Sequence, residues 1–204
     1  MAESSQKGCY MGVDTGKRLH VVILQEGRTF TSKPHRLVYL TECGDFSELN
    51  ELVRRFNVRA GVIDGLPETH ATRAFARSHG SWYPCFFSEH QRGMAKWERD
   101  DRAVTVNRTE ALDASRAAIR EAKFFLPRRA PLVEVLARHM SADAKVLDEV
   151  PDTGALKYRY VPTGVDHYSL AFTYAWMAIG KHHMSSIPVS FGGAPPYEPN
   201  DEEP

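Results

Sequence analysis

The stretch CYMGVDTGKRLHVVILQ, residues 9–25, decides how this chain begins to fold. Two apolar runs, 9–13 and 19–25, are typical of strands, and the turn-forming sequence TG between them indicates a hairpin. Asp14 stands where the first strand ends. A carboxylate at the end of a buried strand is costly to desolvate unless a partner such as a cation balances its charge. The stretch therefore raises the question of whether the chain supplies further ligands near Asp14.

Composition places the chain among globular proteins. It has 204 residues, of which 42% are hydrophobic and 25% charged, enough for one domain with a sizeable core. The sequence contains no run of about eighteen apolar residues, so no membrane span is expected. The polar N-terminus lacks the apolar centre of a signal peptide. The three cysteines are far apart and form no CxxC pair. This favours free thiols in a reducing compartment over a disulfide framework or a zinc site.

Charge is distributed unevenly, although the formal net charge is zero. The last fourteen residues, FGGAPPYEPNDEEP, contain four acids and no base. The part of the chain that precedes them is therefore mildly basic, which is compatible with a DNA partner without demanding one. We expect a disordered N-terminus over 1–8, one folded domain over 9–183, and a disordered acidic, proline-rich tail over 184–204.

The pattern of apolar residues predicts a mixed α/β fold. A third strand is expected over 36–43. An amphipathic helix follows over 46–56, with Asp45 as its N-cap and Glu48 three residues on in a capping box. The next strand, 58–63, completes a strand–helix–strand unit, which is usually a right-handed parallel crossover. Residues 58–63 should therefore lie in the sheet beside the first strand.

The remaining elements follow from the same kinds of signal. They are a helix from Pro67 to about Ser78, strands over 81–87 and 103–107, a helix over 109–125 capped by Thr109, a helix over 131–139, a β-hairpin over 146–162 that turns at Asp152-Thr153-Gly154, and a mostly apolar helix that begins at Asp166. The sequence shows no internal repeat.

Three aspartates stand at the ends of predicted elements. Asp14 and Asp64 each follow a strand, and the carboxyl ends of parallel neighbouring strands lie at the same edge of a sheet. Asp166 opens the last helix, whose apolar side must pack on that sheet. Carboxylates gathered in this way repel one another, and oxygen ligands of this kind suit Mg²⁺ or Mn²⁺. Two such ions about 4 Å apart can activate a water and stabilise the leaving oxygen in phosphodiester cleavage.

Each aspartate taken alone has an ordinary structural explanation. Asp-Gly and Asp-Thr-Gly are common turn sequences in which the carboxylate bonds to its own backbone. An aspartate at the start of a helix is usually an N-cap. The combination of all three in this topology favours a metal site.

Three segments carry a resemblance to a known family. GVDTGKRLHVVI at 12–23, GVIDGLPETH at 61–70 and GVDHYSLAFTYAWMA at 164–178 resemble, in order and spacing, the three acidic motifs of the nuclease domain of phage terminase large subunits. The resemblance covers about residues 9–180. It implies a ribonuclease H-like fold, with a mixed central sheet flanked by helices and an added β-hairpin, and it implies cleavage of double-stranded DNA during genome packaging.

The same resemblance implies a site and a setting. Asp14, Asp64 and Asp166 would be both metal ligands and catalytic residues, with two ions, Mg²⁺ or Mn²⁺, as cofactors. The implied partners are double-stranded DNA, a packaging ATPase domain, and portal or small terminase proteins, in the cytoplasm of an infected bacterial host. Full-length family members carry an N-terminal packaging ATPase. The chain contains no GxxxxGK[ST] loop, so it corresponds at most to the nuclease part.

Four further side chains are weaker candidates for DNA contact. Lys157 and Arg159 lie two residues apart in the predicted hairpin, so they share one face of a strand and could grip a phosphate backbone. Arg108 precedes a helix and could balance phosphate charge, and His167, next to Asp166, could assist a metal-bound water. The ordinary alternatives are edge-strand charges that prevent aggregation, and surface or capping residues.

The leading hypothesis is a metal-dependent endonuclease that cuts double-stranded DNA by two-metal-ion hydrolysis, as the nuclease part of a packaging terminase. Geometry decides whether three carboxylates share a cation. A catalytically inactive ribonuclease H-like module that binds DNA or a partner is therefore an alternative, as is a junction-resolvase-type nuclease. A sugar-kinase or actin-like ATPase also holds phosphate on an Asp-x-Gly turn, but that class needs two such lobes and typically more than 204 residues.

Overall fold

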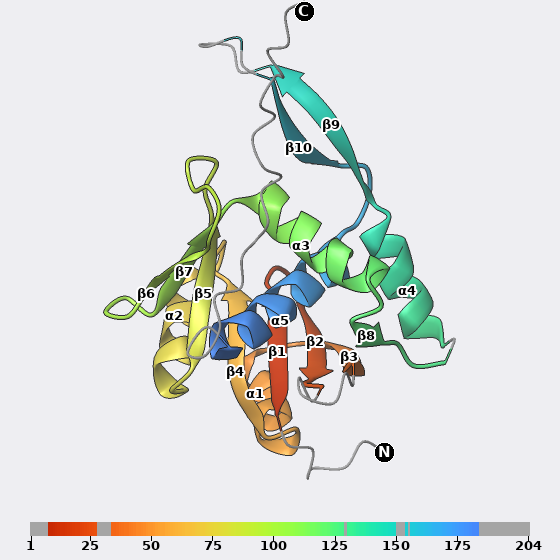
Figure 1. The fold of residues 1–204 in the computed structure, drawn as a ribbon. Coiled ribbons are helices and arrows are strands. Elements are labelled where there is room, and N and C mark those ends of the chain that lie inside the picture. The colour runs from red at the N-terminus through yellow and green to blue at the C-terminus, as the bar shows by residue number, and fades with distance from the viewer. Residues whose placement is uncertain (1–7, 28–33, 129, 150–153, 155, 184–204) are drawn as a thin grey trace, which may run out of the picture.

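A mixed β-sheet runs through the middle of the molecule in a computed structural model, which describes residues 8–27, 34–128, 130–149, 154 and 156–183 (Figure 1). The sheet has eight strands in the order β6-β7-β5-β4-β1-β2-β3-β8. Their bounds are β1 Cys9–Asp14, β2 Leu19–Gln25, β3 His35–Cys43, β4 Val58–Asp64, β5 Trp82–Phe87, β6 Lys96–Glu98, β7 Ala103–Val106 and β8 Phe124–Phe125. Apart from Gly8, the termini predicted to be disordered, 1–8 and 184–204, lie outside the described residues.

The first three strands form an antiparallel meander, as the turn signals predicted. β1 also pairs in parallel with β4, so the strand–helix–strand unit places its second strand beside the first, as expected. The parallel arrangement continues from β4 to β5 and from β5 to β7. The β1–β4 pair therefore lies in the interior of the sheet, with both carboxyl ends at the same edge.

Helices cover both faces of this sheet (Figure 1). On one face lie α1 (Phe46–Arg55) and α2 (Thr69–Ser78), and on the other lie α3 (Arg108–Arg120), α4 (Pro131–Met140) and α5 (His167–His183). Alternate residues of each strand point to these two faces. None of the described helices is both long and apolar enough to cross a bilayer.

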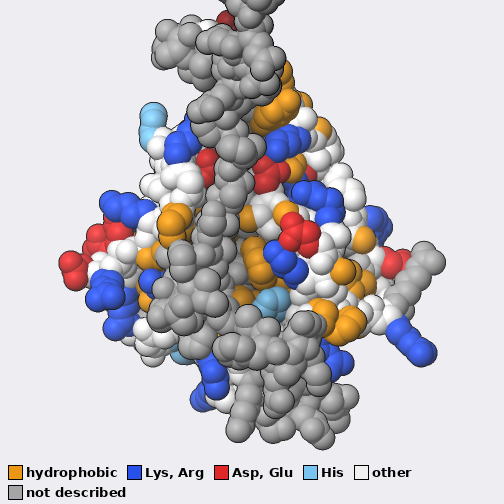
Figure 2. Space-filling model, viewed as in Figure 1, with side chains coloured by type: hydrophobic (Ala, Val, Ile, Leu, Met, Phe, Trp, Pro, Cys, Tyr) orange, Lys and Arg blue, Asp and Glu red, His pale blue; other side chains and the backbone are white. Residues whose placement is uncertain are grey.

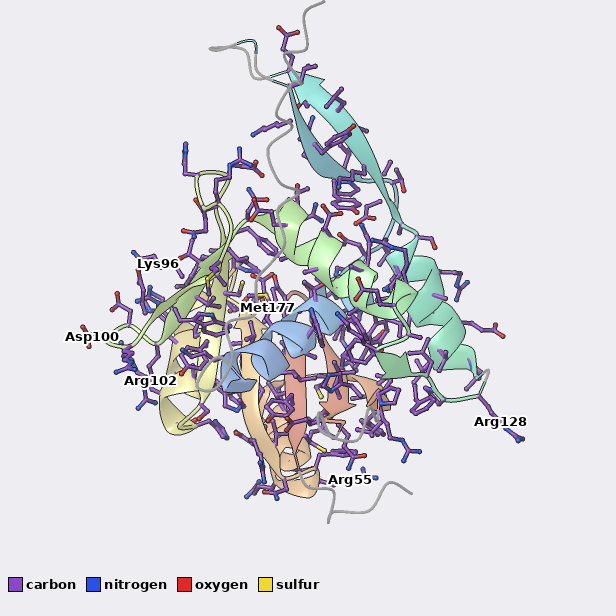
Figure 3. The ribbon with its side chains drawn as sticks, in the orientation of Figure 1. Arg55, Lys96, Asp100, Arg102, Arg128 and Met177 are labelled. Carbon is purple, nitrogen blue, oxygen red and sulfur yellow. The ribbon has the colours of Figure 1, made fainter. Side chains whose placement is uncertain are left out.

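Helix α5 lies directly against β1. An ideal Cβ on Gly12 would stand 1.9 Å from the Ala171 carbonyl oxygen and 2.3 Å from the Ala175 amide nitrogen, so only glycine admits the helix backbone here. Met177 of α5 lies at the centre of the molecule, whereas Arg128 extends outward at its periphery (Figure 3). The contact at Gly12 therefore sets how closely α5 approaches the sheet.

The predicted hairpin is present as a separate two-stranded sheet of β9 (Asp143–Glu149) and β10 (Leu156–Pro162). It projects away from the main sheet (Figure 1). It begins at Asp143 rather than at 146, and most of its predicted turn, 152–154, lies outside the described residues.

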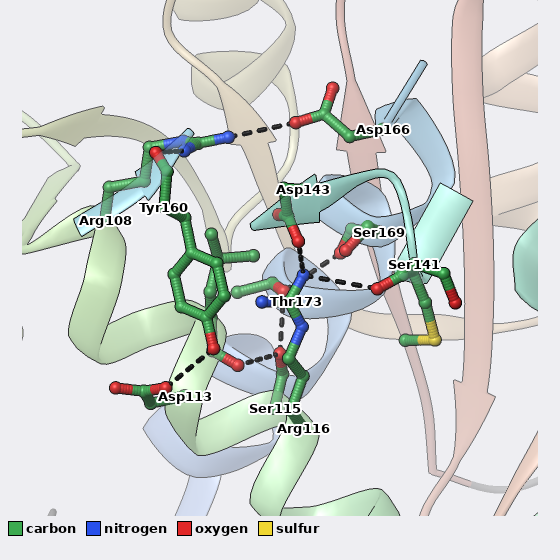
Figure 4. Close-up of polar contacts among 12 residues, drawn as sticks. Arg108, Asp113, Ser115, Arg116, Ser141, Asp143, Tyr160, Asp166, Ser169 and Thr173 are labelled. Carbon is green, nitrogen blue, oxygen red and sulfur yellow. Dashed lines mark hydrogen bonds and ion pairs between the residues drawn. The ribbon is translucent and has the colours of Figure 1, made fainter. Parts of the chain in front are cut away.

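Contacts with α3 anchor the base of this hairpin. Arg116 of α3 forms an ion pair with Asp143, whose side chain is 1% exposed. The Tyr160 hydroxyl of β10 donates to Asp113 of α3 at 2.8 Å (Figure 4). The hairpin is therefore held at its base, where the chain returns toward α5.

Asp45 is the N-cap of α1, as predicted, while Glu48 reaches back to the residue before the cap rather than to the cap itself. Asp45 accepts hydrogen bonds from the amides of Ser47 and Glu48, and the Glu48 side chain accepts one from the amide of Gly44. A local signal of this kind sets the start of the helix without help from the rest of the fold.

Helix α3 differs from its predicted bounds at both ends. Asn107, not Thr109, is its N-cap, since the Asn107 side chain accepts a hydrogen bond from the Glu110 amide. The helix ends early because Ala122 takes a left-handed conformation, with φ of 53°. Phe124–Phe125 then pairs with β3 as strand β8 instead of continuing the helix.

Two smaller differences concern helix α2 and the edge strand β6. Helix α2 begins at Thr69 rather than at Pro67, with Glu68 at its N-cap position. Strand β6 is not predicted by the sequence pattern, because it is short and depends on antiparallel pairing with β7.

We expect Gly12→Ala to destabilise the protein by about 3 kcal/mol or more, because the added methyl group would overlap the backbone of α5. Gly180→Ala, which changes a glycine of α5 itself, is a matched control. A Cβ at Gly180 would meet nothing within 4 Å, so this change should raise stability by up to about 1 kcal/mol. Urea unfolding of both variants measures the difference. Similar stabilities for the two would contradict the close contact.

Candidate metal centre

The carboxyl ends of β1 and β4 bring Asp14 and Asp64 to the same edge of the sheet. The parallel register places Val13 beside Ile63, so the two aspartates that follow are neighbours on adjacent strands. Alternate residues preceding them on each strand belong to the core beneath α5, so both aspartates project toward that helix. The Asp14 side chain is only 3% exposed.

The start of α5 adds Asp166 and His167 at this edge. His167 lies one turn before the part of α5 that contacts Gly12, and its Nδ1 is 2.8 Å from Asp14 Oδ2. The Asp166 carboxylate accepts a hydrogen bond from Arg108 Nη2 at 2.9 Å (Figure 4). The start of α5 thus brings the Asp166 carboxylate and the His167 imidazole to the end of β1.

Asp64 also has the turn geometry that its sequence suggests. Its Oδ1 accepts a hydrogen bond from the Leu66 amide at 3.1 Å, the arrangement of an Asx turn. The Thr15 hydroxyl donates to the Leu66 carbonyl at 2.7 Å, which ties the loop after β1 to the loop after β4. Asp64 therefore has the turn role that its sequence suggests, and this turn holds it at the same edge of the sheet as Asp14.

Arg108 joins the candidate centre to the hairpin. Its Nη1 donates to the Tyr160 carbonyl oxygen of β10 at 3.0 Å, while its Nη2 donates to Asp166 (Figure 4). The guanidinium thus supplies a positive counter-charge within the protein. Its predicted role beside a phosphate stays a prediction.

Two histidines that sequence reasoning did not single out lie beside His167. The ring of His20 stacks on that of His167, with 4.4 Å between centroids and 18° between planes. His139 Nδ1 accepts a hydrogen bond from the Tyr168 amide at 3.1 Å. His20 has a signal in the sequence, since a tight hairpin places it directly opposite Asp14. His139 has none, because its position depends on how α4 packs against α5.

Burial and mutual repulsion raise the pKa of the Asp14 carboxyl from 3.8 to about 8. Burial is the largest cause, the nearby charges of Asp64 and Asp166 add to it, and Arg108 opposes it. Burial likewise raises the pKa of Asp64 to about 6, although hydrogen bonds from backbone amides oppose that shift. This edge of the sheet therefore disfavours full ionisation of its carboxylates unless a cation joins them.

The donor atoms fit a divalent cation, because carboxylate oxygens are the ligands that Mg²⁺ and Mn²⁺ prefer. Among the described residues, the ligand atoms of Asp14, His20 and His167 lie within 4.8 Å of one another. Asp64 and Asp166 stand outside this group. An ion shared by the three carboxylates therefore requires that these two side chains turn toward Asp14.

Lys157 and Arg159 share one face of β10, as expected from their spacing, but each has an acidic partner within the protein. Lys157 Nζ lies 3.0 Å from Glu89 Oε2, and Arg159 Nε lies 2.5 Å from Asp148 Oδ2. In the view of Figure 2, basic and acidic side chains are interspersed over the coloured surface rather than separated by sign. Phosphate contact by these two residues stays a prediction, and it requires that phosphate replace the carboxylates.

Comparison with solved structures places this geometry in a known fold. The chain aligns with the large terminase nuclease from thermophilic phage G20c with a TM-score of 0.52, at 11% sequence identity, over 83% of this chain and 81% of that one. The fold is that of the large terminase nucleases. The ribonuclease H-like architecture expected from the resemblance is thereby confirmed.

Two further structures align with this terminase-nuclease fold. The large terminase from another thermophilic bacteriophage gives a TM-score of 0.51 at 11% identity, and the alignment covers 85% of this chain but 41% of that one. The G20c nuclease with bound magnesium gives 0.49 at 11% identity, over 86% of this chain and 83% of its own. The sequence itself matches no protein-family model and no curated protein.

The metal-free protein should lose stability as pH rises, with Asp14 as a main cause. The folded-state pKa of Asp14, about 8, lies above its ordinary value of 3.8, so the folded chain keeps a proton that the unfolded chain releases between these values. Each pKa unit of displacement corresponds to about 1.4 kcal/mol. Asp14→Asn should therefore raise the free energy of unfolding more at about pH 8 than at about pH 5.

Urea unfolding in the presence of a chelator, at both pH values, measures this effect. Asp100→Asn, which changes an exposed acid at the periphery (Figure 3), is the control and should leave the pH dependence unchanged. Parallel pH profiles for the wild type and Asp14→Asn would contradict the proposed environment of Asp14.

Proposed function

We propose that the chain is a metal-dependent endonuclease that cuts double-stranded DNA, as the nuclease part of a phage DNA-packaging terminase. The observation that carries this proposal is that the charges of Asp64 and Asp166 act on the buried Asp14 carboxyl, at one edge of a sheet that has the large terminase nuclease fold. The resemblance of the three segments around these aspartates to the acidic motifs of that family supports the same residues.

In the proposed centre, Asp14, Asp64 and Asp166 hold two Mg²⁺ or Mn²⁺ ions. When bound, two such ions supply an activated water and positive charge at the leaving oxygen. The chain's own contribution is to position the ligands. Arg108 orients the Asp166 carboxylate, and the Thr15 hydroxyl holds together the two loops that follow Asp14 and Asp64.

Protonation of Asp14 is coupled to this ligand role. Its pKa of about 8 means that, without a cation, the buried carboxyl holds a proton at neutral pH. A carboxyl group binds a cation in its ionised form, so binding releases that proton and strengthens as pH rises. Relief of repulsion among the three carboxylates favours binding at the same time.

We place the DNA backbone between the centre and the hairpin. Arg108 bonds both to Tyr160 of β10 and to Asp166, the residue before α5, so the base of the hairpin lies beside Asp166. The His167 side chain is 44% exposed there, so it is open to substrate and to water. Lys157 and Arg159 are the proposed phosphate contacts on the hairpin, and Arg108 and His167 are the proposed contacts nearest the scissile phosphate.

A packaging ATPase is the proposed partner, on the same polypeptide or a separate one. The alignment with the second phage's large terminase covers less than half of that protein, and this sequence contains no GxxxxGK[ST] loop that would bind ATP. ATP-driven movement of DNA would therefore depend on another module. Portal and small terminase proteins are the further proposed partners, in the cytoplasm of the infected host.

The purified protein should nick or linearise plasmid DNA with Mg²⁺ or Mn²⁺ and without ATP. Asp14→Asn, Asp64→Asn and Asp166→Asn should each reduce cleavage at least about a hundredfold, equivalent to about 2.7 kcal/mol of transition-state stabilisation. Asp100→Asn removes an acid far from the centre and should have no effect. Agarose-gel assays across both metals measure the rates.

Other outcomes separate the alternatives. Cleavage of branched DNA that spares linear duplex would indicate a junction resolvase, and DNA binding without cleavage in either metal would indicate an inactive module. If Asp166→Asn lowers metal-free stability by about 1 kcal/mol and leaves cleavage intact, Asp166 is a helix cap and not a ligand.

The hairpin contacts should act through charge. Lys157→Ala combined with Arg159→Ala should weaken DNA binding similarly for unrelated sequences and reduce the dependence of affinity on salt, because phosphate contacts release counterions. Arg55→Ala with Arg128→Ala removes the same charge from the periphery (Figure 3) and is the matched control. Fluorescence anisotropy at several salt concentrations measures both. An equal salt slope in the two double variants would show that the hairpin cations serve only the protein's own ion pairs.

A further inference from the structure

A pair of facing residues at the end of the first hairpin is the starting observation. Asp14 and His20 stand directly opposite each other on β1 and β2, and such residues of an antiparallel pair project from the same face of the sheet. Helix α5 covers that face, and its first residue, His167, lies 2.8 Å from Asp14. Three separate elements thus deliver one carboxylate and two imidazoles to the same place.

The donor atoms of these side chains are close enough to converge on one ion. They lie within 4.8 Å of one another, and an ion bound at about 2.1 Å would draw them to about 3 Å. The buried Asp14 carboxylate, 3% exposed, is the fixed member of the set. His167 is 44% exposed and has room to turn its ring from the stack with His20.

His20 has the environment of a metal-binding histidine. The residue is 9% exposed, and its Nδ1 is buried without a hydrogen-bond partner among the described residues. Its other ring nitrogen, Nε2, lies 3.5 Å from Oε1 of Glu42, the facing residue on β3. Metal-binding imidazoles have a carboxylate beside their second ring nitrogen, and Glu42 stands in that position at a distance that is long for a hydrogen bond. An ion would therefore satisfy an atom that has no protein partner.

We infer that Asp14, His20 and His167 form a metal position of their own, which binds a divalent transition-metal ion such as Co²⁺, Ni²⁺ or Zn²⁺ in preference to Mg²⁺. Two imidazoles and one carboxylate suit these ions, whereas Mg²⁺ takes oxygen ligands and retains several waters. The inference rests on the proposed function in one respect, that Asp14 is a ligand shared with the carboxylate position. It goes beyond that function because the two positions would differ in the metal they select.

Co²⁺ is the probe, since its visible absorption reports ligation without reference to activity. Metal-free protein is titrated with Co²⁺ by absorption, and with Co²⁺ and Mg²⁺ separately by calorimetry. His20→Phe keeps a buried aromatic ring against His167 but removes both ring nitrogens. It should weaken Co²⁺ binding at least about tenfold and leave Mg²⁺ affinity within about twofold.

A second variant and a control distinguish the loss of a metal ligand from damage to the fold. Glu42→Ala changes a side chain that is 46% exposed and should weaken Co²⁺ binding about tenfold through the loss of support for His20. His139→Asn changes the neighbouring histidine outside the ligand group and should leave the Co²⁺ spectrum and affinity unchanged.

Equal Co²⁺ affinity in the wild type and His20→Phe would overturn the inference, as would ready displacement of Co²⁺ by Mg²⁺ from the wild type. Asp64→Asn separates this result from the proposed function, because it should abolish plasmid cleavage and retain Co²⁺ binding that depends on His20. A wild-type protein that binds Co²⁺ through His20 and cuts no plasmid would overturn the proposed function and leave this inference standing.

Discussion

The approach of α5 to β1 at Gly12 is the contact on which the candidate centre depends. The backbone of the helix occupies space that a Cβ would need, since that atom would stand 1.9 Å from the Ala171 carbonyl oxygen. A helix seated this closely has little freedom to shift along the strand, because protein interiors are tightly packed. Its first turn therefore lies over the end of β1, where His167 contacts Asp14 and Asp166 meets Arg108. A larger side chain at Gly12 would lift the helix and separate these groups.

The close packing of α5 on β1 also has an electrostatic cost. Burial and two neighbouring acids raise the pKa of Asp14 to about 8, and burial raises that of Asp64 to about 6. A fold selected for stability alone would have little reason to gather carboxylates at a buried edge, and perturbed groups of this kind cluster at functional sites. Burial also lowers the pKa of His20, the histidine opposite Asp14, and so favours the neutral form of its ring.

Local signals in the sequence predicted the parts of the fold that need no distant partner. The first hairpin, the N-cap at Asp45 and the apolar helix that follows Asp166 each follow from residues a few positions apart. Prediction failed where pairing between strands decides the structure. Phe124–Phe125 continues a helical pattern but forms a strand because β3 offers it hydrogen-bonding partners, and β6 exists only through its pairing with β7.

The sequence by itself determined that Asp14 and Asp64 end parallel neighbouring strands and that Asp166 opens a helix that must cover them, because strand and helix periods specify the face on which each residue projects. Only the tertiary structure decided what these residues touch. The stacking of His20 on His167, and the ion pair between Lys157 and Glu89, depend on how distant parts of the chain are arranged in space. Packing joins residues that are far apart in the chain, and no local pattern encodes the distance between them.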